Sequence, residues 1–378
     1  MVSRPSTSKL PPSASATSGR AKPWYRYVNL DLLVRILVNS VFHPYIIFIF
    51  YLTQAALHVH REPLAYYTLC YAAFLGVVEV GANINHRLTY GKHRKVEWEK
   101  EVVVITGGGS GLGRVLAEMI VRKGGKVAIL DVKAPDEEAE DAMERWDLVW
   151  EKCDVSKESD VKKAVDKIVD DLGAPSVLIN NAASGITGLP LVSPATSAMT
   201  LSPGQAARTL NTNTISHFNT LSVLLPHLTK SPQGGHVVTI SSILSHLAPA
   251  SLADYTSSKS AISSLHQTLQ HELRCHPDRS TFARVKTLLV ETGQIKTELF
   301  ADKTTLPPYA EFFGPVLEAK DIAKEIVKTI ERGDGGVIRM PFYAKCMPFY
   351  SILPGTMQAL VRSFSGIDKA ISSGRKAS

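Results

Sequence analysis

Three side chains that could share one proton-transfer step lie close together in the sequence. Tyr255 and Lys259 are four residues apart, and Ser242 precedes Tyr255 by thirteen. If the segment is helical, the phenol and the amine lie on the same face, one turn apart. A phenol with an ammonium neighbour is a candidate general acid. An isolated Tyr-x-x-x-Lys pair is more often a packed tyrosine beside a solvated lysine, so the elements around it must decide.

Composition bounds the class of protein that could hold such a site. The chain has 378 residues, of which 44% are hydrophobic and 20% charged, so it can form one large α/β domain with additions and is not globally disordered. The four cysteines have no paired spacing, which argues against a disulfide framework and against a zinc site. We expect no metal, because the chemistry considered below does not need one.

Basic residues gather in two places. Residues 1–30 carry five and no acid, and residues 86–95 carry four more, which together exceed the net charge of +7. The rest of the chain is therefore slightly negative, whereas a nucleic-acid protein spreads its basic groups over the folded domain. Two basic clusters that flank an apolar region indicate a membrane instead.

The first 95 residues read as a membrane-associated region. Residues 1–27 are typical of a flexible basic tail, although an acid-free start also resembles a transit peptide. Within residues 28–95, the apolar segments 41–57 and 64–82 each approach the roughly 20 residues that span a bilayer. The basic flanks favour a helical hairpin with the main domain in the cytosol. A wedge in one leaflet and buried helices of a soluble protein are the alternatives.

Residues 96–335 alternate between strand-like and helix-like runs. Short apolar strands are expected at 102–105, 127–130, 177–179 and 237–240, separated by helices such as 112–122, 160–171 and 215–228. This alternation predicts an α/β fold with a doubly wound parallel sheet of the Rossmann type. Residues 336–378 are interpreted as a C-terminal extension on the substrate and membrane side, and core packing is an equal alternative for them.

A glycine-rich loop stands directly between the first strand and the first helix. Its sequence from 106 to 113 is Thr-Gly-Gly-Gly-Ser-Gly-Leu-Gly. Such a loop lets backbone amides approach a pyrophosphate at a helix N-terminus, although it could also be only a flexible turn. The candidate cofactor residues of the loop are Gly107, Ser110, Gly111, Leu112 and Gly113.

Asp131 closes the second strand, where a carboxylate can accept hydrogen bonds from an adenosine ribose. A negative charge there repels a 2′-phosphate, so NAD is favoured. Lys133 could neutralise such a phosphate, and NADP therefore stays open.

With these pieces in order, residues 98–335 resemble the classical short-chain dehydrogenase/reductase family. The matching elements are the glycine loop, Asp154-Val155, Asn180-Asn181-Ala182-Ala183, Asn213, Ser242, Tyr255 and Lys259. Two departures are visible, because the family usually has Pro-Gly at Thr292-Gly293 and a glycine at Ala183. The resemblance implies an NAD(P)-dependent alcohol dehydrogenase or carbonyl reductase, and it allows a homodimer.

The resemblance also assigns roles. Asn213, Ser242, Tyr255 and Lys259 would be catalytic, with Asn213 holding a water that links Lys259 to solvent. Tyr255 and Lys259 would also contact the cofactor. Asp154 and Val155 would lie at the adenine, Asn181 and Ala182 on the cofactor side of the sheet, Val290 and Thr292 near the nicotinamide, and Thr297 near the carboxamide or pyrophosphate end.

In this chemistry Tyr255 exchanges a proton with the substrate oxygen, and Ser242 hydrogen-bonds that oxygen. An ammonium at about 4 Å, with an effective dielectric constant near 20, stabilises a phenolate by about 4 kcal/mol. That is enough to lower the pKa of Tyr255 by roughly three before desolvation opposes it. We therefore expect Lys259, helped by the positive nicotinamide, to bring Tyr255 into the working range.

A looser resemblance concerns the substrate. The run 213–218, the apolar N-terminal region and the run from Met340 to Ile367 look like those of membrane-anchored members related to 17-beta-hydroxysteroid and retinol dehydrogenases. This implies a lipophilic substrate and an endoplasmic-reticulum or lipid-droplet membrane. The rival hypothesis is a cofactor-binding scaffold on a lipid surface. The expected apolar lid of residues 291–314 contains Phe300, Leu306, Pro307, Pro308, Tyr309, Phe312 and Phe313.

Overall fold

A parallel sheet of seven strands forms the centre of the computed structural model, which describes residues 28–57, 62–192, 200–296 and 312–368. The strand order is β3-β2-β1-β4-β5-β6-β7, which is the doubly wound arrangement that the alternation of elements predicts. The strands are β1 (Val102–Thr106), β2 (Lys126–Asp131), β3 (Leu148–Lys152), β4 (Val177–Asn180), β5 (His236–Ser242), β6 (Lys286–Thr292) and β7 (Gly336–Met340).

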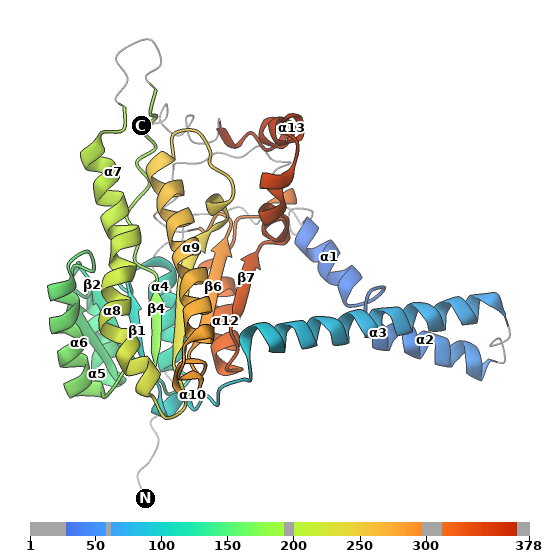
Figure 1. Ribbon diagram of the computed structural model, residues 1–378, viewed down its shortest axis with the longest axis horizontal. Coiled ribbons are helices and arrows are strands. Elements are labelled where there is room, and N and C mark those ends of the chain that lie inside the picture. Colours follow the sequence, from blue (N-terminus) through green and yellow to red (C-terminus); the bar gives the residue numbers. More distant parts are fainter. Residues whose placement is uncertain (1–27, 58–61, 193–199, 297–311, 369–378) are drawn as a thin grey trace, which may run out of the picture.

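Helices cover both faces of the sheet (Figure 1). Because side chains alternate along a strand, Val103 and Ile105 of β1 pack on one face, and Val102 and Val104 pack on the other. The first face is covered by α4 (Gly111–Val121) and α12 (Ala319–Glu331), with α5 (Glu137–Arg145) beside them. The second is covered by α6 (Glu158–Leu172), α8 (Ser216–Lys230) and α9 (Ala253–Cys275), next to the shorter α7 (Pro203–Leu210) and α10 (Arg279–Phe282).

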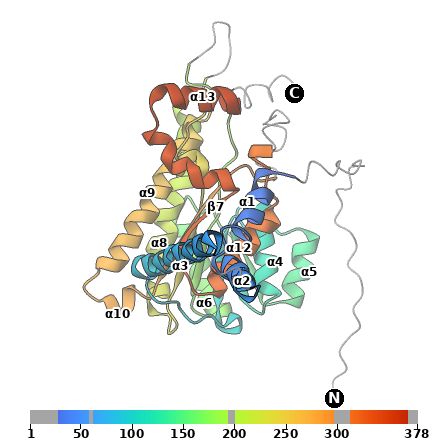
Figure 2. The ribbon, with the colours of Figure 1, turned by 90° about the vertical axis from the view of Figure 1, so that its right-hand side faces the viewer.

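Three N-terminal helices extend from this domain: α1 (Leu30–Val38), α2 (Pro44–Ala56) and α3 (Pro63–Tyr90). Helices α2 and α3 lie side by side and project away from the sheet, and Figure 2 views them nearly end-on. Within the described residues, α3 is the one helix long and apolar enough to cross a membrane by length and composition.

The first arm of this hairpin is shorter than the apolar segment 41–57 suggests. Helix α2 has 13 residues because Pro44 occupies its first position, where a proline has no amide to donate and starts a helix well. The upstream apolar residues form the separate helix α1, which ends at Val38 and is followed by Asn39.

The C-terminal extension folds back over the domain as η5 (Phe342–Ile352) and α13 (Gly355–Ser365). The Phe342 amide donates to Asp31 of α1 at 2.5 Å, so the C-terminal extension begins in contact with the first described helix. Arg362 of α13 forms an ion pair with Asp368 at 2.6 Å and donates to the Ala248 carbonyl, which lies in the loop after β5. The extension therefore lies against the loop that separates Ser242 from Tyr255.

Candidate active site

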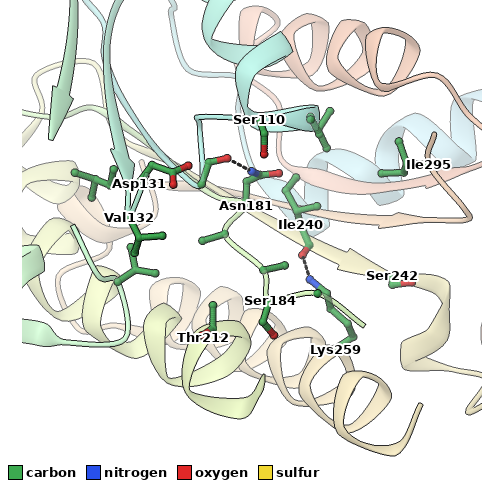
Figure 3. Close-up of a pocket in the computed structure, with 18 of the residues that line it drawn as sticks. Ser110, Asp131, Val132, Asn181, Ser184, Thr212, Ile240, Ser242, Lys259 and Ile295 are labelled. Atoms are coloured by element: carbon green, nitrogen blue, oxygen red, sulfur yellow. Dashed lines mark hydrogen bonds between the residues drawn. The ribbon is translucent and has the colours of Figure 1, made fainter. Parts of the chain in front are cut away.

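A cavity of about 540 Å³ opens at the carboxyl ends of the central strands (Figure 3). It lies where the strand order reverses between β1 and β4, which is the usual ligand position in a doubly wound sheet. Most of the residues that the sequence nominates line it: Gly107, Ser110, Gly111, Leu112, Asp131, Asp154, Val155, Asn181, Ala182, Ser242, Tyr255, Lys259 and Thr292.

The glycine loop is shaped by close backbone contacts. Gly107 has φ +63°, and a Cβ there would lie 2.8 Å from the Ala182 Cα. A Cβ on Gly113 would collide with the Gly107 carbonyl and lie 2.6 Å from the Asn181 Nδ2. Gly113 therefore packs the start of α4 against the loop and does not line the cavity. Ser110 precedes α4 without capping it through its side chain, so its hydroxyl does not occupy the first-turn amides.

Two short 3₁₀ helices adjoin strands of the sheet. One, η2 (Trp98–Lys100), leads into β1, and the other, η4 (Ile243–Ser245), follows Ser242.

Asp131 and Asp154, which the sequence predicts at the adenosine of a cofactor, both line the cavity. Asp131 accepts from the Gly109 amide at 2.9 Å and from the Lys133 amide at 3.0 Å, which ties the end of β2 to the glycine loop. Asp154 accepts from the hydroxyl and the amide of Ser156, and this hydroxyl is the main cause that lowers the pKa of Asp154. The Asp154 carboxylate is thus anionic at neutral pH, and backbone contacts fix both carboxylates.

Asn181 fastens β4 to the same loop. Its Nδ2 donates to the Gly107 carbonyl at 2.9 Å and to the Thr106 carbonyl at 3.1 Å, while its amide donates to the Thr106 hydroxyl. The asparagine therefore shapes the floor of the cavity by its contacts within the protein.

Tyr255, Lys259 and Ser242 come together as their order predicts, all of them buried. Ser242 ends β5, accepts from the Leu244 amide at 3.2 Å and hydrogen-bonds the Tyr255 side chain. On α9, the Lys259 ammonium lies 5.7 Å from the centre of the Tyr255 ring and donates to the Ile240 carbonyl at 2.9 Å (Figure 3). The carbonyl that holds the ammonium belongs to the strand that carries Ser242.

Burial dominates the acid–base properties of this pair. It raises the pKa of Tyr255 to about 12, and the hydrogen bond from Ser242 opposes the change. It lowers the pKa of Lys259 to about 8. Without a cofactor, desolvation of the phenolate therefore outweighs the hydrogen bond from Ser242. The expected lowering of the Tyr255 pKa, which also counts the positive nicotinamide, stays a prediction.

Asn213 lies behind the cavity and does not line it. It belongs to a π-helical turn, η3 (Asn211–Ile215), a distortion that is frequent at functional sites. The Asn213 Oδ1 accepts from the Ser184 amide at 2.7 Å, and its Nδ2 donates to the Ser258 hydroxyl at 3.0 Å. The side chain thus joins the loop after β4 to α9, directly beside Lys259.

Two predicted cofactor residues lie elsewhere. Val290 lies two residues before the end of β6, so it does not reach the cavity at the carboxyl end of the strand. It is fully buried, pairs with Ile240 and packs in the core under α12. Thr297 is outside the described residues. Of the expected lid, Phe312 and Phe313 are described, and the aromatic rings of Phe313 and Phe364 of α13 lie 5.7 Å apart. Phe300, Leu306, Pro307, Pro308 and Tyr309 are outside the described residues.

Several lining residues were not predicted. Ser184 and Thr212 line the cavity beside α9, and Ile240 lines it next to Lys259. Ser184 follows the Asn-Asn-Ala-Ala motif by one residue, so its position was a usable signal. Ile240 contacts Lys259 through its backbone carbonyl, which every residue type has, so the sequence could not predict this contact.

Comparisons with known proteins show the family of this chain. The family model described as short chain dehydrogenase matches residues 101–306. An uncharacterized oxidoreductase of Saccharomyces cerevisiae, TDA5, is 29% identical over 72% of this chain and 78% of its own length. Retinol dehydrogenase 10-B of Danio rerio is 28% identical over 74% of this chain and 85% of its own length. Estradiol 17-beta-dehydrogenase 11 of Homo sapiens is 27% identical over 61% of this chain and 71% of its own length.

A solved structure shares the fold. The short chain dehydrogenase of Burkholderia cenocepacia, solved in complex with NADP, matches with a TM-score of 0.54 and 22% identity. The match covers 71% of this chain and 99% of the other.

Proposed function

Because the chain belongs to the short-chain dehydrogenase family, we propose that it transfers a hydride between NAD or NADP and a lipophilic alcohol or ketone at a membrane. The observation that carries the proposal is the buried grouping of Ser242, Tyr255 and Lys259 at the cavity. Such a grouping offers a proton donor, a cation and a hydrogen-bonding hydroxyl to one substrate oxygen.

The residues around the cavity fit a dinucleotide. The glycine loop packs closely against the end of β2, since a Cβ on Gly109 would lie 2.8 Å from the Asp131 carboxylate, and its residues Gly107, Ser110 and Gly111 line the cavity. We assign Ser110, Gly111 and Leu112 to the pyrophosphate, Asp131 to the adenosine ribose, Asp154 and Val155 to the adenine, and Asn181, Ala182 and Thr292 to the nicotinamide half. When bound, the oxidised cofactor would supply a hydride acceptor and a positive charge.

The protein's own part is to move a proton and to hold the substrate. The Tyr255 hydroxyl gives its proton to the substrate oxygen in reduction and takes one back in oxidation. With its pKa raised by burial, the phenol carries its proton at neutral pH and can donate it in reduction. Ser242 donates to the same oxygen, and the Lys259 ammonium stabilises the phenolate that forms.

Asn213 contributes by position. Both ends of its amide are used by Ser184 and Ser258, so it holds the loop after β4 against the helix that carries Lys259. This supports a role in aligning the site, beside the water-holding role that the family pattern implies.

A lipid substrate is supported by the surroundings of the cavity and by the names of two relatives. Retinol and estradiol dehydrogenases are among the similar proteins. The outer surfaces of α2, α3 and α13 expose large apolar side chains, which include Phe50, Phe74, Leu360 and Phe364. We infer that a substrate dissolved in a bilayer reaches the cavity beside α13.

The hairpin is proposed to enter one leaflet and return. Helix α2 has 13 residues, about 20 Å, and a bilayer core is about 30 Å thick. The basic residues that flank the apolar region then remain on the cytosolic side of an endoplasmic-reticulum or lipid-droplet membrane. Flotation of the full chain with vesicles, compared with a chain that lacks residues 30–90, tests this part.

An activity screen tests the chemistry. Detergent-solubilised protein is offered retinoids, steroids, long-chain alcohols and sphingoid ketones, with NAD and NADP side by side and the appearance or loss of NAD(P)H as the signal. Turnover of at least one lipid class is expected. Protein that binds NADH but converts none of these compounds would contradict the proposal and support the scaffold alternative.

A further inference from the structure

Glu291 is a buried carboxylate beside the active site that the mechanism above does not use. It lies on β6 directly before Thr292, is 1% exposed, and does not line the cavity. A carboxylate is rarely buried to this extent unless it is paired. Its partners therefore indicate what it holds together.

The partners of Glu291 come from three other elements. The Arg339 Nε of β7 donates to its Oε2 at 2.6 Å. The His246 Nε2 lies 3.0 Å from its Oε1, and the Ser245 hydroxyl, whose nearer acceptor is the Ser242 carbonyl at 2.7 Å, lies 3.3 Å from the same oxygen. Ser245 ends the 3₁₀ helix that follows Ser242, and His246 comes directly after it, so the carboxylate contacts the chain immediately after the Ser242 hydroxyl.

The fourth partner lies on α9. The Ser263 hydroxyl donates to the Glu291 Oε1 at 3.4 Å, and Ser263 is one helical turn beyond Lys259. The Ser263 hydroxyl also lies 2.8 Å from the Ser241 hydroxyl, which in turn lies 3.1 Å from the Lys259 carbonyl, so the two hydroxyl protons are shared among these three contacts. The same carboxylate is thus connected to the helix that carries Tyr255 and Lys259.

The charge on Glu291 is compensated. Burial acts to raise its pKa, but the hydrogen bond from His246 and the positive charge of Arg339 outweigh burial, so the pKa is lowered and the group stays anionic at neutral pH. A charged acceptor makes stronger and more directional hydrogen bonds than a neutral one. The network therefore has a rigid anionic centre.

We propose that Glu291 is a positioning residue, which fixes the turn after Ser242 relative to α9 and thereby sets the Ser242 and Tyr255 hydroxyls against one substrate oxygen. The inference rests on the proposed function. Its physical basis is that a displacement of about 1 Å between reacting groups can cost on the order of a hundredfold in rate.

The test replaces Glu291 by an isosteric neutral side chain and compares it with a matched control. In Glu291→Gln we expect kcat to fall at least tenfold, while KM for the substrate and Kd for NADH change less than threefold. The control is Glu101→Gln. Glu101 is 2% exposed and pairs with Arg94 at 2.5 Å, but at the opposite end of the sheet, so its loss should lower thermal stability and leave kcat within twofold.

Two outcomes overturn the proposal. One is a Glu291→Gln protein that keeps kcat within twofold while its melting temperature falls as in Glu101→Gln, because that pattern describes a structural role only. If Glu291→Gln does not fold, His246→Gln replaces it, since His246 is partly exposed and its loss leaves the carboxylate in place. A threefold fall in kcat is expected there, and an unchanged kcat would refute the role.

A measurement that does not need turnover separates this inference from the proposed function. The ¹³Cζ resonance of Tyr255, assigned through Tyr255→Phe, reports the hydrogen bond between Ser242 and Tyr255. It should shift in Glu291→Gln and stay in place in Glu101→Gln. If wild-type protein turns over no lipid but the shift appears, the proposed function fails and the positioning role survives. If the resonance does not move, the positioning role fails by itself.

Discussion

At the amino end of the sheet, Arg94 and Glu101 form a buried ion pair that the Ser176 hydroxyl and the Gly234 carbonyl complete. At the carboxyl end, the ammonium of Lys259 is equally buried, but its contact is the carbonyl of Ile240 and burial alone sets its pKa. A charge that serves the fold is neutralised by a partner. A charge next to the cavity is held by a dipole and stays available for a phenolate or a substrate.

The largest effect should follow from removing the proton donor at the carboxyl end. We expect Tyr255→Phe to lower turnover at least a hundredfold, because general acid–base catalysis commonly contributes 10² to 10⁴. Binding of NADH, followed by fluorescence, should persist. The matched change at the amino end is Tyr90→Phe. The Lys286 ammonium donates to the backbone carbonyl of Tyr90, which this substitution keeps, so turnover should stay within twofold. Retention of most activity in Tyr255→Phe would break the comparison.

A second effect concerns stability and pH. The folded pKa of Lys259 is about 8 and its ordinary value is 10.5, so between these values the unfolded chain binds a proton that the folded chain does not. The free energy of unfolding of the wild type should therefore rise by about 2 kcal/mol between pH 8 and 10 from this group. Lys259→Met should lack that rise in denaturation curves measured across the range.

Lys286 at the amino end is the control for this effect. Burial also lowers its pKa, but Asp334 opposes the change, so Lys286→Met should remove a smaller part of the rise. If both variants lose the same part of the rise in unfolding free energy, the two buried lysines have equally lowered pKa values and the contrast between the two ends of the sheet fails. Above pH 10 the raised pKa of Tyr255 acts in the opposite direction and destabilises the fold as pH rises, so the comparison is made below it.

A smaller effect is expected for cofactor choice. In Asp131→Asn one of the two backbone contacts, from the Gly109 amide or from the Lys133 amide, is kept by the single amide oxygen, while the other contact and the negative charge that repels a 2′-phosphate are lost. The ratio of kcat/KM for NADP to that for NAD should rise about tenfold, which corresponds to about 1.4 kcal/mol. Asp334→Asn, on the amino side of the sheet, should leave the ratio unchanged. An unaltered ratio in Asp131→Asn would remove the argument for NAD.

Local patterns were sufficient for much of the fold. The alternation of apolar runs gave the parallel sheet, and the glycine loop lies between β1 and α4 because it joins them in the sequence. Tyr255 and Lys259 share a face of α9 for the same reason, since four residues make about one helical turn. These features depend on neighbours along the chain, so a sequence contains them.

Only the tertiary structure decided how the site is held and charged. The carbonyl of Ile240 that receives Lys259, the amide of Asn213 that joins Ser184 to Ser258, and the carboxylate of Glu291 all bring together residues from separate elements. The pKa of Tyr255 follows the same rule, because the sequence supplies the ammonium four residues away while the surrounding elements supply the burial that outweighs it. Spacing along the chain fixes which groups are neighbours, but desolvation depends on every element packed around them.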